Sequence, residues 1–247
     1  MVRKLVYSLL YVAAFVAATS FTAPKYGKLT IRFENFIGDK TLKLDSVYYK
    51  NALGQSYNVS MFKYYVGNFH LKNKGGKEFI SHGYFLINQE DKGSMQITID
   101  SVPFGEYNGI DFTLGVDSID NCSGAQSGVL DPVNGMFWAW NTGYIFLKME
   151  GLSPVSNSTG KRLEFHIGGY KSPNNCIKSI VLERLIIVGG KGSQGITISA
   201  DLNKLFSSSN PIDFTKLSSV TDFHNAKEIA DNYSAMFSIS GSNNGFK

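Results

Sequence analysis

Both tryptophans of this 247-residue chain lie two positions apart in one short stretch, GMFWAWNTGY at 135–144. In an extended segment Trp138 and Trp140 point to the same face, because successive side chains of a strand alternate. Three interpretations of this pair are open. The indoles are buried in a core, or they form an exposed platform that stacks on sugar rings, or one indole is oxidised to a product that binds metal.

Four histidines are available for a metal site, and none of them lies two or four positions from another. His166, in RLEFHIGGY at 162–170, alternates out of phase with apolar neighbours and falls on the more polar face of a predicted strand. His70 falls on the face of another predicted strand, at 61–73, that carries Asn68 but also Tyr64 and Val66. Each is either a surface histidine or a ligand, and any metal site must join segments that are distant in sequence.

Four aspartates, Asp111, Asp117, Asp120 and Asp131, surround a long segment without clear periodicity at 118–134. Aspartate commonly caps turns by bonding to its own backbone. Two other interpretations are a calcium site, which uses several oxygen ligands from one irregular loop, and a carboxylate pair for glycoside hydrolysis. The loop lacks the regular spacing of a calcium motif, and no Gly-x-Ser-x-Gly elbow indicates a hydrolytic serine.

The first residues predict export. Arg3 and Lys4 precede an uncharged apolar run that ends in small residues, Ala18-Thr19-Ser20, which is typical of a signal peptide over 1–20. The run is shorter than the roughly 20 residues of a membrane span, although an uncleaved anchor is the alternative. We therefore expect a periplasmic, secreted or cell-surface protein with no membrane span after cleavage.

Export also bears on the two cysteines and on the charge. Oxidising compartments favour disulfides, so we expect Cys122 and Cys176 to be paired. Their spacing does not fit a zinc site. The formal net charge of +4 includes Arg3 and Lys4 of the export segment. No clustered Lys/Arg stripe remains, which argues against nucleic acid as a partner.

Alternating apolar and polar residues recur along the chain and indicate strands. The predicted strands are 29–38, 41–50, 61–73, 82–88, 94–102, 107–117, 144–151, 162–170, 176–188 and 194–201. After Thr221-Asp222, apolar residues at three- and four-residue spacing between Ala226 and Phe237 predict one short C-terminal helix. The fold class is therefore all-β, an antiparallel β-sandwich that is Greek-key, immunoglobulin-like or barrel-like. We expect a single domain over 27–240.

Several motifs resemble the MbnP-like family, exported β-proteins named for the copper-binding partner of methanobactin. They are LGVDS (114–118), SGxLDPxxGMFWxW (127–140), NxGYIFxKxEG (141–151) and FHIGGY (165–170). YYVGNFHL (64–71) and ADNYSAMF (230–237) fit as well. The resemblance covers most of residues 27–240, and its GMFWxWxxGY block is long and unusual.

The resemblance implies a copper-binding protein that is not an enzyme. In such proteins a tryptophan is converted to kynurenine by a separate di-haem peroxidase-like partner. Carried over to this sequence, the ligand candidates are His166, Trp138 or Trp140 as the precursor, and His70. Indole offers only an N–H donor, whereas kynurenine has an aniline nitrogen and a carbonyl, and imidazole suits copper. The alternatives are a surface adhesion or carbohydrate-binding module and a structural β-domain without metal.

A site that joins His166 to a tryptophan places a demand on the chain. If 144–150 and 161–167 form a simple hairpin, His166 lies opposite Tyr144 or Ile145. Trp140 is then about 16 Å away, at roughly 3.3 Å per strand residue. The chain must therefore bend at Asn141-Thr142-Gly143, where Gly143 permits a bend or bulge.

Overall fold

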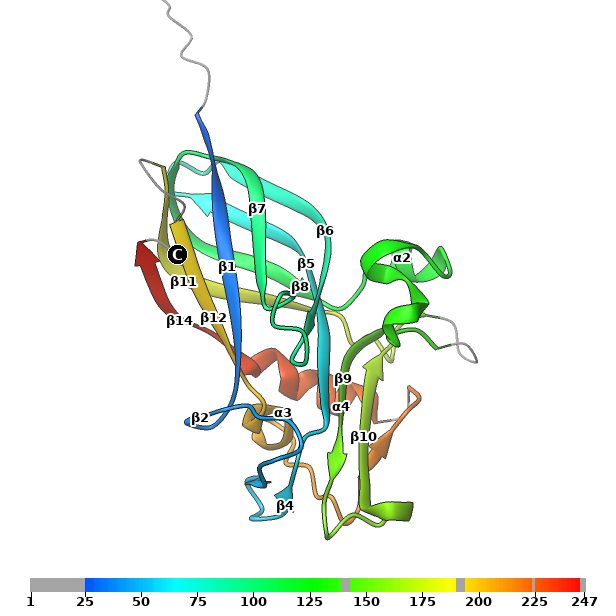
Figure 1. Ribbon diagram of the computed structural model, residues 1–247. Coiled ribbons are helices and arrows are strands. Elements are labelled where there is room, and N and C mark those ends of the chain that lie inside the picture. The colour runs from blue at the N-terminus through cyan, green and yellow to red at the C-terminus, as the bar shows by residue number, and fades with distance from the viewer. Residues whose placement is uncertain (1–24, 139–142, 190–193, 224, 245–247) are drawn as a thin grey trace, which may run out of the picture.

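The computed structural model describes residues 25–138, 143–189, 194–223 and 225–244 (Figure 1). The expected signal peptide over 1–20 and Trp140 lie outside these residues. No helix within the described ranges has the length and apolar character needed to cross a membrane.

Two sheets form the body of the protein and confirm the predicted all-β sandwich. The first sheet contains β1 (Tyr26–Ile37), β2 (Lys40–Thr41), β7 (Gln96–Pro103), β12 (Gln194–Asp201) and β14 (Phe237–Asn244). The second contains β5 (Met61–Asn73), β6 (Glu78–Asn88), β8 (Gly105–Leu114), β9 (Ile145–Leu152), β10 (Arg162–Gly168), β11 (Lys178–Val188) and β13 (Ser219–Val220). Pairing is mostly antiparallel, but β1 pairs with β12 and β10 with β13 in parallel.

Aromatic side chains fill the space between the sheets. In β1 the alternation predicted from the sequence buries Leu29, Ile31 and Phe33. The Phe33 ring meets Tyr64 of β5 and Phe112 of β8 edge-on, with centroid separations of 6.2 and 6.1 Å. Each such ring removes roughly 150–250 Å² from water, so these contacts dominate the core.

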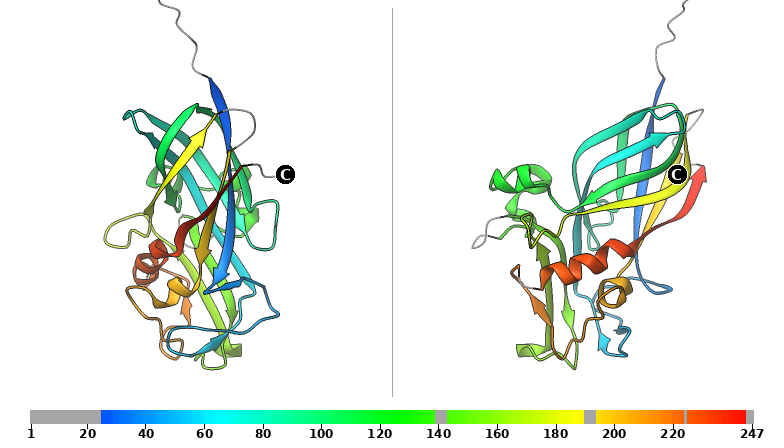
Figure 2. Two further views of the ribbon diagram at one scale, coloured as in Figure 1. Left: turned by 90° about the vertical axis from the view of Figure 1, so that its left-hand side faces the viewer. Right: turned by 180° about the vertical axis from the view of Figure 1, so that it is seen from behind.

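The predicted C-terminal helix is present as α4 (Ala226–Tyr233), followed by η4 (Ser234–Met236). Its apolar stripe is buried as expected, but Phe237 opens strand β14 instead of extending the helix. A short helix, α3 (Asn203–Ser207), packs beside α4. Figure 2 shows α4 crossing between the upper strands and the β9–β10 hairpin.

The prediction of one continuous strand over 41–50 is wrong. Only its ends are extended, as β2 and as β3 (Tyr49–Lys50), which pairs with β4 (Ser56–Tyr57). Between them Asp45 has a φ of +59°, a left-handed conformation that lies outside the β region. Leu42 and Tyr49 are nevertheless buried, and because they are seven residues apart they would lie on opposite faces of a single strand.

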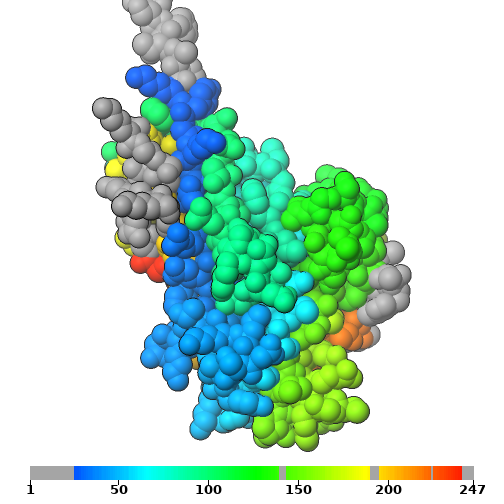
Figure 3. All heavy atoms as spheres, viewed as in Figure 1, coloured from blue at the N-terminus to red at the C-terminus, as the bar shows by residue number. Residues whose placement is uncertain are grey.

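The long segment between β8 and β9 leaves and rejoins the sheet along the same edge of β5. One edge of β5 pairs with β6, while the other is shared: 61–64 pair with β9 and 66–73 with β8. The chain leaves this edge after Leu114 and returns at Ile145. Between these points lie α2 (Ser118–Cys122), η1 (Gly128–Leu130) and η2 (Pro132–Asn134). Figure 3 shows this green segment as a lobe on the side of the molecule.

Candidate functional site at the tryptophan hairpin

The chain reverses direction between Trp138 and Gly143. The Trp138 backbone N–H donates to the Gly143 carbonyl at 3.2 Å, and the Ile145 N–H donates to Met136 at 2.9 Å. Phe137 and Tyr144 form the bridge between these two bonds. The described residues 136–138 and 143–145 therefore run antiparallel, as the predicted bend requires, and we call them the tryptophan hairpin; Asn141 and Thr142 lie outside the described residues.

Gly143 and Asn121 hold this reversal in place. Gly143 has a φ of +122°, and a β-carbon there would lie 2.8 Å from the Asn121 Oδ1, so only glycine fits. The buried Asn121 accepts the Tyr144 N–H at 2.9 Å and donates to the Asp117 carbonyl at 2.9 Å. Asn121 thereby ties α2 to the hairpin. The sequence reasoning missed this residue, because a single asparagine in a loop carries no periodic signal.

Two lysines attach the base of the hairpin to the outer face of the sheet. Lys63 of β5 and Lys148 of β9 are paired residues. Lys63 Nζ donates to the Asn134 carbonyl at 3.4 Å, and Lys148 Nζ donates to the Gly135 carbonyl at 3.2 Å. The segment that leads into Trp138 therefore lies over this face.

Trp138 is buried, with 4% of its surface exposed. Its ring lies against Gly168, where an added β-carbon would come within 2.8 Å of the indole Cη2 and Cζ3 atoms. Phe223 covers the indole edge-on at a centroid distance of 5.5 Å. This burial fits the core interpretation, and it means that Trp138 cannot form half of an exposed sugar-stacking platform.

His166 lies on the outer face of the β9–β10 hairpin, but the predicted register is wrong. His166 pairs with Lys148, not with Tyr144 or Ile145. The turn is centred later than expected, because Leu152 pairs with Arg162 and the connection contains η3 (Thr159–Lys161). Beyond His166, an irregularity in β9 between Ile145 and Leu147 moves the register by one residue in the opposite direction, so that Gly168 pairs with Ile145.

A carboxylate holds the His166 imidazole. His166 Nε2 lies 2.8 Å from Glu150 Oε1, and Lys148 Nζ lies 3.3 Å from the same oxygen. Burial and the Lys148 ammonium lower the pKa of His166, so the imidazole is neutral at neutral pH. Burial by itself raises the pKa of Glu150, but the His166 hydrogen bond and the Lys148 charge outweigh it and the pKa is lowered.

The structure brings Trp138 to the strand that carries His166. Gly168, which the indole contacts, is two residues beyond His166 in β10. Strand alternation puts positions 166 and 168 on one face, about 6.6 Å apart along the strand. A sequence signal for this contact existed in the Gly168-Gly169 pair of FHIGGY, since glycine in a strand often marks the close approach of another group.

A pocket of 260 Å³ opens beside the indole. It is lined by Gly169, Tyr170, Lys171, Ser172, Asn174 and Phe223. Phe223 therefore touches Trp138 on one side and the pocket on the other. The loop that lines the pocket, residues 169–176, is closed by a hydrogen bond from the Cys176 N–H to the Gly169 carbonyl at 2.8 Å.

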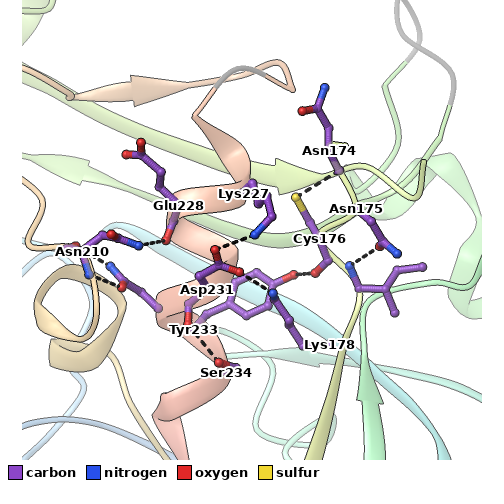
Figure 4. Close-up of polar contacts among 12 residues, drawn as sticks. Asn174, Asn175, Cys176, Lys178, Asn210, Lys227, Glu228, Asp231, Tyr233 and Ser234 are labelled. Atoms are coloured by element: carbon purple, nitrogen blue, oxygen red, sulfur yellow. Dashed lines mark hydrogen bonds and ion pairs between the residues drawn. The ribbon is translucent and has the colours of Figure 1, made fainter. Parts of the chain in front are cut away.

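Helix α4 supports the far end of this loop (Figure 4). The Tyr233 hydroxyl donates to the Cys176 carbonyl. Lys178 Nζ contacts Asp231 at 2.5 Å, and Lys227 contacts the other oxygen of Asp231 at 2.7 Å. These bonds lower the pKa of Asp231, and they fix residues 176–178 to the helix.

The predicted Cys122–Cys176 disulfide is absent, since both residues are free thiols. Cys122 is exposed at the end of α2, with its sulfur 3.5 Å from the Tyr170 hydroxyl. Cys176 is fully buried, and its thiol contacts the Asn174 carbonyl at 3.5 Å. The sulfurs occupy different environments, and burial raises the pKa of the Cys176 thiol to about 12.

The capping interpretation of the aspartates is confirmed at two positions. Asp117 accepts the N–H groups of Ile119 and Asp120 at the start of α2, and Asp131 accepts the Val133 N–H at η2. Asp120 instead contacts Gln126, at 3.5 Å. Within the described ranges, no group of three His, Cys, Asp or Glu residues could hold a metal ion, so the calcium interpretation has no support.

His70 lies away from the tryptophan hairpin. It is seven residues beyond Lys63 in β5, and Lys63 pairs with Lys148, the partner of His166. At roughly 3.3 Å per residue this is about 23 Å along the strand. His70 is flanked by Glu78, whose Oε2 lies 3.2 Å from Nε2, and by Asp111, whose Oδ2 lies 3.8 Å from Nδ1. The structure therefore does not bring His70 together with Trp138 and His166.

Comparison with known proteins gives two matches. A family model described as MbnP matches residues 26–224. Among solved structures, MbnP from Methylosinus trichosporium is similar in fold, with a TM-score of 0.53 and 18% sequence identity. The likeness covers 76% of this chain and 80% of that chain. A search of curated proteins gives no significant match.

Proposed function

Because the chain belongs to the MbnP family, we propose that it is an exported copper-binding or copper-handling protein, and not an enzyme. Its site contains His166 and a kynurenine made from Trp138. The observation that carries this proposal is the position of the Trp138 indole over Gly168, two residues from His166 on the same face of β10.

The chemistry of the two side chains fits copper once the indole is oxidised. His166 is neutral at neutral pH because its pKa is lowered, so one ring nitrogen carries a lone pair. The indole N–H is a donor only and binds no cation. Kynurenine would add an aniline nitrogen and a carbonyl oxygen as further ligands. The imidazole beside them is a ligand type that suits copper.

Conversion of Trp138 requires an oxidant. Cleavage of the C2–C3 bond of the indole by one dioxygen molecule puts one oxygen atom on each carbon and gives N-formylkynurenine. Water then hydrolyses the formyl group, which leaves as formic acid. We assign the activation of dioxygen to a separate di-haem peroxidase-like partner, in keeping with the family resemblance.

Access to the indole runs through Phe223. This side chain is half-buried, contacts Trp138 and lines the 260 Å³ pocket. A rotation of Phe223 toward the pocket would uncover one edge of the indole without unfolding β10. The pocket would admit dioxygen and would give room to the N-formylkynurenine intermediate, which has two more heavy atoms than tryptophan.

Intact mass and copper binding of protein isolated from its native host test the proposal. We expect the mature chain to have lost residues 1–20 and to have exchanged one carbon atom for one oxygen. Peptide mapping should place this change at Trp138, and the protein should bind copper at micromolar concentration. Trp140→Phe is the matched control, which should keep the mass change. Unmodified tryptophan together with no copper binding would support a structural β-domain, the interpretation that the burial of Trp138 favours.

A further inference from the structure

We infer that Glu150 is a positioning residue that keeps His166 protonated at Nε2 and leaves Nδ1 as the atom that binds copper. The inference rests on the proposed function for its metal. Its first part, the state of the metal-free imidazole, stands on the contacts of the chain itself.

The hydrogen bond between His166 and Glu150 fixes the proton. Nε2 and Oε1 are 2.8 Å apart, and the carboxylate side chain is 29% exposed. An ionised carboxylate accepts hydrogen bonds and does not donate them, so Nε2 must carry the hydrogen. A neutral imidazole has one donor and one acceptor nitrogen. Nδ1 therefore holds the lone pair.

Lys148 makes Nε2 the less favourable of the two ring nitrogens for a metal cation. Its ammonium lies 3.3 Å from the Glu150 oxygen that His166 also contacts. A metal cation at Nε2 would displace the proton, break the Glu150 bond and lie close to the Lys148 charge. A cation at Nδ1 would leave the Nε2 proton and the Glu150 bond in place. Within the described part of the chain, no hydrogen bond involves Nδ1.

The same lysine joins the imidazole to the tryptophan hairpin. Lys148 Nζ donates to the Gly135 carbonyl at 3.2 Å, immediately before Met136. A chain of contacts thus runs from the hairpin base through Lys148 and Glu150 to His166. Carboxylates that hold the second nitrogen of a metal-binding histidine orient the ring and raise its basicity, and Glu150 is placed to do this.

Nitrogen NMR of histidine-labelled, metal-free protein tests the first part. We expect long-range correlations to show His166 with hydrogen on Nε2, and Glu150→Ala to produce a mixture of tautomers. Glu150→Gln should retain the Nε2–H form, because the amide oxygen still accepts this bond. A hydrogen on Nδ1 in the wild type, or a tautomer that is the same in Glu150→Ala, would overturn the inference.

Titration with Cu(I) tests the second part. The Nδ1 resonance should shift while Nε2 keeps its proton, and Glu150→Ala should weaken binding about 10- to 100-fold. Glu164→Gln is the matched control. Glu164 lies opposite Glu150 on the same face and contacts Arg162 at 3.8 Å. Its charge acts on the His166 pKa less than Glu150 does, so its loss should change affinity much less than Glu150→Ala.

The two ideas fail in different ways. A wild type that has the Nε2–H tautomer, loses it in Glu150→Ala and binds no copper would defeat the proposed function and still support the positioning role. A wild type that binds copper through Nε2, or as tightly after Glu150→Ala, would overturn the inference and leave the proposed function standing.

Discussion

His166 and His70 occupy similar positions in strands and yet have different neighbours. Both lie on the outer face of the seven-stranded sheet, and their side chains are 17% and 21% exposed. Burial therefore does not distinguish them. At His166 one nitrogen contacts a carboxylate, and an indole lies two residues along the strand. At His70 both nitrogens face carboxylates, those of Glu78 and Asp111.

The difference shows that the ability of a histidine to bind a metal depends on whether one ring nitrogen has no carboxylate partner. His70 Nε2 is buried within ion-pair distance of Glu78, although it is not aligned as a hydrogen bond. A proton on either His70 nitrogen meets a negative charge, which is the environment of a structural ion pair. His166 keeps a nitrogen that its carboxylate does not occupy, which is the arrangement of a metal ligand with an outer partner.

Replacement of each histidine by alanine gives the largest expected effect. Loss of an outer carboxylate typically weakens metal binding 10- to 100-fold, so loss of the ligand in His166→Ala should exceed about 100-fold. His70→Ala should leave copper affinity unchanged, because His70 is about 23 Å away. Competition with a Cu(I) chelator measures both. Equal losses in the two variants would remove the distinction between the two histidines.

Much of the fold follows from periodicity in the sequence. Strand β5 spans 61–73 and β12 spans 194–201, as alternation predicts, and α4 buries the predicted stripe. Alternation determines which face of a strand is buried, so it placed His166 on the polar face. It put His70 on the face of Tyr64 and Val66, which are buried, and the irregularity at Asn68, where φ is +49°, turns His70 to the outer face. Alternation also misassigned 41–50, where the left-handed Asp45 interrupts the chain and the buried residues Leu42 and Tyr49 are out of phase with each other.

Contacts between segments could not be predicted in the same way. The register of β9 and β10 depends on the turn at η3 and on the irregularity after Ile145. The partner of His166 follows from that register, and Glu150 can be identified only once the register is known. The cysteine prediction was wrong for a related reason, because composition gives the compartment but not the distance between two loops.

The glycines beside the two histidines provide a matched pair of stability tests. A β-carbon on Gly168 would come within 2.5 Å of the Tyr144 carbonyl and 2.8 Å of the Trp138 ring. A β-carbon on Gly109, which lines a pocket with Asp111, would lie 2.4 Å from the Leu182 carbonyl. We expect Gly168→Ala and Gly109→Ala each to lower the free energy of unfolding by about 1–3 kcal/mol.

Only one of these two variants should disturb the indole. Denaturant unfolding measures stability, and the emission of Trp138 in a Trp140→Phe background reports on its surroundings. Gly168→Ala should shift this emission and weaken copper binding, whereas Gly109→Ala should do neither. A shift in both variants would mean that the two regions are coupled through the sheet.

Phe223 offers a smaller and more local test. An edge-to-face aromatic pair contributes about 0.5–1.5 kcal/mol beyond burial, so Phe223→Leu should cost roughly that much. It should also raise the acrylamide quenching of Trp138 measured in the Trp140→Phe background, because the indole gains access to the pocket. Phe79→Leu, beside Glu78 in β6, is the control. Unchanged quenching in Phe223→Leu would show that the indole is covered by other groups.

Neutralising the carboxylate partners should have the smallest effect on metal-free protein. Glu78 is 51% exposed, and exposed ion pairs contribute about 0–1 kcal/mol, so Glu78→Gln should fall within that range. Glu150 is less exposed and makes a 2.8 Å bond, so Glu150→Gln should cost more. Salt sharpens the contrast, since it screens exposed pairs more than partly buried ones. Unfolding at low and high ionic strength should show the Glu78 effect vanish and the Glu150 effect persist. Equal salt dependence would mean that Glu150, the carboxylate partner of His166, is as solvated as Glu78, the partner of His70. The two histidines would then differ only in the indole that lies near His166.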